Sequence, residues 1–311
     1  MNHIRSQDPS DTTPTFLTDL SERDRLWDSH RRKTTQVGHI YQDSEFHQHY
    51  AERMHLCSTF LDFRLVPSEH ELKLKLSRAA FCHVRFCPVC QWRRSLILHA
   101  KALTIIPKVL EAYPTYRWLF LTLTVKNVPI SNLREELNYL NESFKRLIKL
   151  KSFPGEGWLK CTEVTRGSNG SAHPHFHVLM MVKPSYFGVN YLSLDKWRSM
   201  WRKSARLDYD PQIDITTFKT TETNLTQVLC EVIKYQVKEN DLVSDPKWTL
   251  ELTDQLKNTR AISTGGILKT YFRELANESE DLIGKGDEDE ETLGHIFVLW
   301  RRDCQRYIVK D

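Results

Sequence analysis

Three histidines occur within five positions of the chain, at residues 173, 175 and 177 of HPHFHVLMMV (173–182). The apolar residues that follow them predict a buried strand. Because side chains two apart in a strand share a face, His175 and His177 point the same way and Phe176 points into the core. This geometry suits two imidazoles on one metal ion. The alternative interpretation is that a strand end simply tolerates polar residues.

A carboxylate on the preceding segment is the third candidate ligand. GWLKCTEVTRG (157–167) is predicted to be a strand, and the Ser-Asn-Gly-Ser that follows it a hairpin turn. If the turn centres on Gly170, Glu163 lies opposite His177, with Cβ atoms about 5 Å apart. His173 has the same parity and is a competing ligand or a supporting group beside the site. Two imidazoles and one carboxylate, with coordination positions left open, favour a catalytic Mn²⁺ or Mg²⁺.

A tyrosine further along the chain is the candidate nucleophile. LTQVLCEVIKYQVKEN (225–240) is predicted to be a helix with Glu231 and Tyr235 four residues apart on one face. Lys234 and Lys238 lie beside them and are further candidates for DNA contact. A phenol with a pKa of about 10 is a poor nucleophile at neutral pH, but a metal that polarises the electrophile and nearby cations make it useful. The alternative is a surface tyrosine without a chemical role.

Four cysteines have spacings typical of a structural zinc site. They are Cys57, Cys82, Cys87 and Cys90, the last two in a Cys-Pro-Val-Cys knuckle. Four soft ligands at such spacing predict tetrahedral Zn²⁺. His83 is an alternative ligand in place of Cys82 or Cys57. The other interpretation is a set of buried thiols without a metal.

Positive charge is concentrated around this knuckle. The chain carries a net charge of +4, but residues 72–110 contain eight Lys or Arg and no Asp or Glu. A basic block in a folded region suggests a polyanionic partner, although a solvated helix face gives the same pattern. The side chains suited to phosphate contact and base stacking are Arg85, Trp92, Arg93 and Arg94. Residues 278–291 are acidic, and a solvated loop is the default interpretation.

The elements that position these residues predict an α+β fold, with a central antiparallel sheet flanked by helices and a small Cys-rich zinc-binding subregion. Helices are predicted at 91–113, 131–150, 193–207 and 225–240, and strands at 117–127, 157–167, 173–182 and 211–218. Residues 296–311 are predicted to form a terminal strand pair. The expected domains are a flexible N-terminal arm (1–48) with room for a short helix near 20–29, a Cys- and Arg-rich zinc-binding and DNA-binding module (49–115), a catalytic domain (116–275) and an acidic loop with a C-terminal extension (276–311).

The N-terminal residues MNHIRSQDPSDTTPTF are polar and lack the apolar stretch of a signal peptide. No apolar run approaches the roughly 20 residues of a membrane span. We therefore expect a cytoplasmic protein without a membrane partner, whose cysteines are reduced thiols or metal ligands.

Four motifs together carry a resemblance to a known family. FLTLT (120–124), HPHFH (173–177) and CEVIKYQVK (230–238) resemble, in this order, the three motifs of rolling-circle plasmid replication initiators of the HUH endonuclease superfamily. CHVRFCPVCQWRRS (82–95) resembles the Cys-rich segment of one branch of these initiators. The resemblance covers roughly residues 50–275.

This resemblance implies an activity and roles for particular residues. Tyr235 would attack a phosphodiester of single-stranded or stem-loop plasmid origin DNA, forming a 5′-phosphotyrosine link and freeing a 3′-OH for a host polymerase, with a host helicase as a further partner. His175 and His177 would hold the metal, beside FLTLT as the central strand. Glu231 would act as a general base for water at termination. No second tyrosine lies one turn away, which indicates the single-tyrosine type.

Three other functions remain open at this point. One is a transposase or conjugative relaxase of the same superfamily, although relaxases usually place the tyrosine ahead of the histidines. The second is a non-catalytic zinc-ribbon DNA-binding protein, in which the histidine strand is structural. The third is a metallohydrolase that acts on small molecules.

Overall fold

The computed structural model describes residues 14–68, 72–218, 220–233, 236–273 and 292–310. These residues form two compact units. The first contains residues 14–42, 48–89 and 292–310, and the second contains residues 43–47 and 90–273, in both cases without the gaps just given. None of the helices within these ranges is long and apolar enough to cross a lipid bilayer.

The first unit combines an antiparallel sheet of order β2-β1-β8-β9 with short N-terminal helices. Its strands are β1 (Phe60–Pro67), β2 (Leu72–Ala79), β8 (Gly294–Arg301) and β9 (Arg306–Lys310), and its helical segments are α1 (Leu17–Leu20), η1 (Glu22–Asp24), α2 (Arg25–Gln42) and α3 (Gln48–His55). Asp28 of α2 accepts a hydrogen bond from the backbone N–H of Tyr307 at 2.9 Å. Trp27 packs edge-on against Phe63, which ties α2 to the sheet.

The helix α2 corrects our expectation of a flexible arm over residues 1–48. Its buried stripe mixes apolar with polar side chains, namely Trp27, Asp28, His30, Arg31, Thr34, Val37, Ile40 and Tyr41. These positions follow helical spacing, but a search for apolar periodicity alone does not detect them. Residues 1–13 lie outside the described part of the chain. The predicted terminal strand pair is confirmed by β8 and β9, whereas the acidic segment 278–291 also lies outside the described residues.

The second unit is built on a five-stranded sheet of order β6-β3-β5-β4-β7, antiparallel throughout. The strands are β3 (Arg117–Thr124), β4 (Gly155–Arg166), β5 (Ala172–Val182), β6 (Ile213–Thr217) and β7 (Ile262–Gly266). The helical segments are α4 (Pro88–Ala112, from Cys90 onward in this unit), η2 (Ile130–Asn132), α5 (Leu133–Leu147), η3 (Pro184–Phe187), α6 (Leu194–Ser204), α7 (Glu222–Val232), α8 (Glu239–Ser244), α9 (Pro246–Leu256) and α10 (Leu268–Tyr271).

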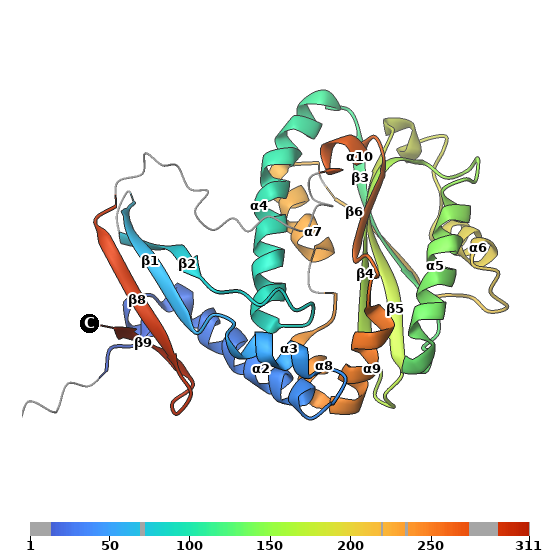
Figure 1. The fold of residues 1–311 in the computed structure, drawn as a ribbon. Coiled ribbons are helices and arrows are strands. Elements are labelled where there is room, and N and C mark those ends of the chain that lie inside the picture. The colour runs from blue at the N-terminus through green and yellow to red at the C-terminus, as the bar shows by residue number, and fades with distance from the viewer. Residues whose placement is uncertain (1–13, 69–71, 219, 234–235, 274–291, 311) are drawn as a thin grey trace, which may run out of the picture. The chain divides into compact units, whose positions relative to one another are not determined.

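Helices cover both faces of this sheet (Figure 1). On one face, α4 and α7 pack over a core that includes Leu159, Leu179 and Met181. On the other face, Phe144 of α5 meets Phe176 edge-on, with ring centroids 5.9 Å apart. The predicted α+β class is confirmed. The histidine strand β5 is itself the centre of the sheet, and FLTLT lies in the neighbouring strand β3, so its expected central place is corrected by one strand.

Candidate metal centre

Glu163 of β4 and His175 and His177 of β5 converge on one point of the sheet. Nε2 of His177 lies 3.0 Å from Oε2 of Glu163, and Nε2 of His175 lies 3.4 Å from the same oxygen. The possible ligand atoms of all three residues lie within 4.8 Å of one another. Two imidazole nitrogens and one carboxylate therefore meet as the sequence predicted, in a set that fits a divalent cation with open coordination positions.

The register of the hairpin differs from the predicted one by two residues. Glu163 pairs with His175, not His177, and Thr165 pairs with His173. The turn centres on Asn169 because the N–H of Gly167 donates to the carbonyl of Ser171 at 2.8 Å. Since a shift of two residues leaves every side chain on its original face, Glu163 still joins the histidines.

Hydrogen bonds at Nδ1 orient both imidazoles. Nδ1 of His177 lies 3.2 Å from Oγ1 of Thr122, and the ring stacks on Phe120. Nδ1 of His175 lies 3.2 Å from the carbonyl oxygen of His173. The carbonyl of His173 can only accept, so Nδ1 of His175 carries a proton. A metal ion would take the place of the Nε2 protons that otherwise face Glu163, leaving both Nε2 atoms as ligands. Sequence reasoning missed Thr122, although its position within FLTLT, two residues after Phe120, was a signal.

The charge state of Glu163 also suits a cation. Burial opposes its ionisation, but hydrogen bonds from His175 and His177 and their positive charge outweigh that effect. The pKa of the Glu163 carboxyl therefore lies well below its usual range, and the group is ionised at neutral pH.

His173 lies beside the centre but outside the ligand set. Its ring centroid is 5.2 Å from that of His175, and it pairs across the hairpin with Thr165. Burial and the nearby His175 lower the pKa of its imidazole. Its carbonyl accepts a hydrogen bond from Nδ1 of His175. This geometry favours a role for His173 in orienting a ligand over a role as a ligand.

The opposite face of the same strands contains a buried lysine. Nζ of Lys160 lies 3.6 Å from the centroid of the Phe176 ring and donates to Oδ1 of Asn141 at 2.7 Å. Only 5% of Lys160 is exposed. Burial lowers the pKa of its amine to about 7. Phe176 thus lies in the core, as predicted, and its ring packs against an amine that sequence reasoning missed.

The predicted helix 225–240 is wrong beyond Val232. α7 ends there, and α8 begins at Glu239. The carbonyl of Gln236 accepts a hydrogen bond from the N–H of Val164 at 2.9 Å, so the chain leaves the helix to satisfy the outer edge of β4. The described residues Gln236 and Val237 are not helical, so the predicted helix does not run unbroken to residue 240.

The predicted residues of this segment fall on both sides of that break. Glu231 is exposed in the last turn of α7, and Lys238 is exposed immediately before α8. Lys234 and Tyr235 lie outside the described residues. The side chain of Glu163 lies on the sheet face that α7 covers, because it shares parity with Leu159 and Cys161 of that core.

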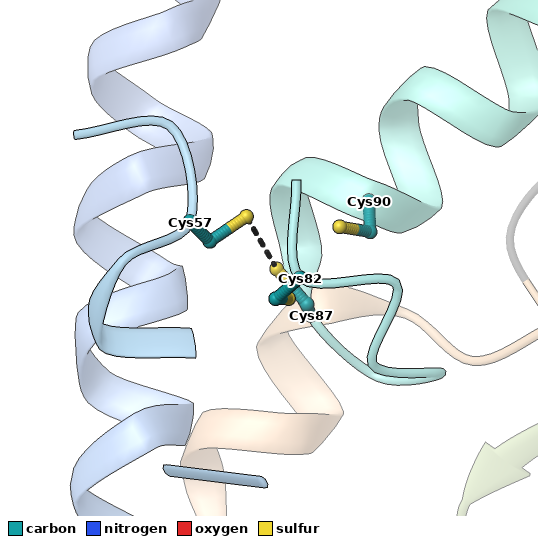
Figure 2. Close-up of side chains that lie close together, drawn as sticks. All are labelled: Cys57, Cys82, Cys87 and Cys90. Carbon is teal, nitrogen blue, oxygen red and sulfur yellow. Dashed lines mark hydrogen bonds between the residues drawn. The ribbon is translucent and has the colours of Figure 1, made fainter. Parts of the chain in front are cut away.

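The four predicted cysteines lie together (Figure 2). Their sulfur atoms all lie within 4.8 Å of one another, and all four residues are buried. Cys57 follows α3, Cys82 follows β2, Cys87 precedes α4, and Cys90 is in its first turn. Exposed His83 does not belong to this group, so the proposed replacement of a cysteine by His83 is not supported.

The spacing and surroundings of the sulfurs suit a metal. Sγ of Cys57 and Sγ of Cys87 are 3.6 Å apart, close to the roughly 3.8 Å that tetrahedral zinc with Zn–S bonds of about 2.3 Å requires. The hydroxyl of Thr34 accepts from the N–H of Val89 at 3.2 Å and lies 3.5 Å from Sγ of Cys87, to which it can donate. Such donors stabilise thiolates.

Comparison with known proteins identifies the family. A family model described as Replication protein matches residues 73–308. The chain belongs to this family. A Protein rep of Streptococcus pneumoniae serotype 2 is 34% identical over 310 residues, covering 95% of this chain and 96% of the relative. A Protein rep of Bacillus amyloliquefaciens is 33% identical, covering 92% and 94%. A Replication protein of Staphylococcus aureus is 32% identical, covering 67% and 96%. No solved structure gives a significant match.

Membership of the replication protein family confirms the resemblance to rolling-circle plasmid initiators that the motifs indicated. The matched range contains the histidine strand, Glu163 and residues 231–238, whereas Cys57 precedes it. Six side chains of this replication protein are predicted to contact DNA. Arg85, Trp92, Arg93 and Arg94 are half-buried, Lys238 is exposed, and Lys234 lies outside the described residues. Their role in DNA binding stays a prediction.

Proposed function

We propose that this plasmid replication initiator nicks single-stranded or extruded stem-loop origin DNA through Tyr235. The phenolic oxygen attacks the phosphorus of the scissile phosphodiester. A bond forms between phosphorus and the tyrosine oxygen, and the bond to the 3′ oxygen breaks. The phenol gives up its proton to solvent and the departing oxygen takes one, which leaves a 5′-phosphotyrosine and a free 3′-OH.

One observation carries the proposal. Nε2 atoms of two imidazoles and Oε2 of Glu163 converge on the sheet face that α7 covers. Gln236, the described residue that directly follows Tyr235 in the chain, is hydrogen-bonded to Val164, which directly follows Glu163. The chain at Gln236 therefore runs beside the part of β4 that carries Glu163.

The residues of the centre would hold the divalent cation that binds and orients the scissile phosphate. Mn²⁺ or Mg²⁺, when held by Glu163, His175 and His177, would polarise the phosphate and stabilise its growing negative charge. The carbonyl of His173 keeps a proton on Nδ1 of His175, and Thr122 orients the ring of His177 through its Nδ1. Lys234 and Lys238 are the cations that we assign to the developing phenolate.

We assign the termination of replication to Glu231, in the same segment as Tyr235. Glu231 would take a proton from water, whose oxygen attacks the phosphorus of the phosphodiester at the end of replication in place of a second tyrosine. The bond from phosphorus to the 3′ oxygen breaks and that oxygen takes a proton, which leaves a 5′-phosphate and a free 3′-OH. The freed 3′-OH would prime a host polymerase while a host helicase unwinds the plasmid. The four cysteines would bind structural Zn²⁺ and hold Arg85, Trp92, Arg93 and Arg94 for origin DNA.

The test uses a labelled origin stem-loop oligonucleotide and Mn²⁺, with a denaturing gel to detect a covalent protein–DNA species. The wild-type protein should form it, and Tyr235→Phe should not. Tyr191→Phe, at an exposed position away from the centre, is the matched control and should form the adduct normally. DNA binding without cleavage would indicate a binding module, and cleavage without attachment a hydrolase. Either result, or an adduct in Tyr235→Phe, would overturn the proposal.

A further inference from the structure

A candidate ligand-binding site lies in the first unit, beside the N-terminal helices α2 and α3. Residues of α2, of α3 and of the β8–β9 turn enclose a cavity of about 750 Å³. Its lining includes two arginines and two histidines, Arg31, Arg302, His39 and His55, and one carboxylate, Glu52. A cavity of this size accommodates a small ligand such as a nucleotide.

Arg31 is the unusual member of the lining because it is buried without a counter-ion. Only 2% of the residue is exposed. Its guanidinium donates to Oγ1 of Thr35 and to the carbonyl of His55, each at 3.1 Å. Its Nε is buried and has no hydrogen-bond partner among the residues the structure describes. A buried charge without an opposite charge is costly, and its cation–π contact with Trp300 at 5.6 Å offsets only part of that cost.

Arg302 brings a second guanidinium to the same cavity. Within the described part of the chain, its recorded contacts are to the ring of His55. The neighbouring Arg301 differs, because it forms an ion pair with Asp303 at 2.8 Å. Neither Arg31 nor Arg302 forms an ion pair with a described carboxylate, and Glu52 is the sole acid among the described lining residues.

We propose that this cavity binds a phosphate group of a nucleotide or of a nucleic-acid backbone. Two guanidiniums without carboxylate partners match the planar, bidentate recognition of phosphate oxygens. The ligand would supply the negative charge that Arg31 lacks. The site is separate from the candidate metal centre and does not depend on the nicking activity of Tyr235.

A binding measurement without added divalent metal tests this proposal and prevents nicking. The probe is a fluorescent deoxynucleoside 5′-monophosphate, followed by anisotropy, with inorganic phosphate as competitor. We expect saturable binding that Arg302→Ala weakens about tenfold, the effect of losing a charge-assisted hydrogen bond. Arg301→Ala, in the same turn but already paired with Asp303, should bind as the wild type does. Arg31→Lys keeps the buried charge and should bind more tightly than Arg31→Met.

Competitors identify the natural source of the phosphate. An oligonucleotide without terminal phosphates that displaces the probe indicates backbone phosphodiesters of DNA. Displacement by monophosphates alone indicates a free nucleotide. Either result supports the site. Absence of saturable binding by the wild type, or equal binding by Arg301→Ala and Arg302→Ala, would overturn the proposal, whatever the outcome of the nicking assay.

Discussion

The carbonyl oxygen of Gln236 accepts a hydrogen bond of 2.9 Å from the backbone N–H of Val164. This bond joins the strand that carries Glu163 to the segment 230–238, some 70 residues later in the chain. Val164 follows the candidate ligand Glu163, and Gln236 follows the candidate nucleophile Tyr235. The bond forms only because α7 stops at Val232, so the end of that helix belongs to the architecture of the site.

Removing the charge of Glu163 should weaken metal binding without unfolding the protein. Glu163→Gln keeps the shape of the side chain but loses the carboxylate that the two Nε2 atoms face. We expect the Mn²⁺ affinity, measured by calorimetry, to fall by roughly tenfold to hundredfold. Glu156→Gln on the same strand, which loses only a surface ion pair with Lys183, is the control. Unchanged Mn²⁺ affinity in Glu163→Gln would refute the ligand set.

The hydroxyl of Thr122 should matter through His177. Thr122→Val removes the partner of Nδ1 while retaining a β-branched side chain in β3. We expect Mn²⁺ affinity to fall by roughly tenfold, because the imidazole loses its fixed tautomer and orientation. Thr216→Val, on the neighbouring strand β6, should have no effect. If both variants bind Mn²⁺ equally well, Thr122 has no positioning role.

Glu231 should be needed to end the reaction and not to begin it. Glu231→Gln cannot take a proton from water, so the protein should nick at the normal rate and then accumulate the covalent adduct. Glu222→Gln, at the other end of α7, is the control. The adduct is followed over time on denaturing gels. A variant that releases DNA as fast as the wild type would remove Glu231 from the mechanism.

The buried amine of Lys160 should make stability depend on pH. The unfolded chain takes up its proton as the pH falls through 10.5, whereas the folded protein does so only near the lowered pKa of about 7. Because the unfolded state binds more protons between these values, the free energy of unfolding falls as the pH drops. Lys160→Met should flatten this slope by up to ~1.4 kcal/mol per pH unit between about pH 7.5 and 9. Denaturant unfolding across this range measures it, and identical slopes would contradict the prediction.

The cysteine group should bind one zinc ion per chain, measured by elemental analysis. Cys87→Ser removes a ligand at the centre of the group and should abolish stoichiometric zinc. Loss of the ion should lower the thermal midpoint by roughly 10 °C, since the binding energy of structural zinc contributes to folding. Cys304→Ser, at an exposed thiol, should change neither quantity. Zinc-free wild-type protein of unaltered stability would exclude a structural ion.

The sequence predicted the candidate site better than the elements around it, for a physical reason. Face alternation depends on parity alone, so Glu163 joined the histidines although the register was wrong by two residues. Local sequence patterns do not reveal which strands pair when they are far apart in the chain. β1 pairs with β8, more than 200 residues later, and only the last two strands of that sheet were predicted. Polar side chains inside the buried stripe of α2 hid that helix.

The end of α7 shows the same limit. Residues 225–240 have continuous helical periodicity, and nothing within them indicates a break. The competing hydrogen bond comes from Val164, some 70 residues earlier in the chain. A hydrogen bond to the edge of a strand from a distant part of the chain outweighed the local preference for helix there.

The outer edge of β4 has a further consequence for how partners approach. Beyond β7, its N–H groups are taken one after another: Thr162 donates to Ala261, Val164 to Gln236, and Arg166 to the carboxylate of Asp241. Because these three donors are already used, this part of β4 is a poor template for pairing with a further strand. In the proposed mechanism, DNA would therefore approach Glu163 and the histidines without pairing as a strand-like partner along this part of β4.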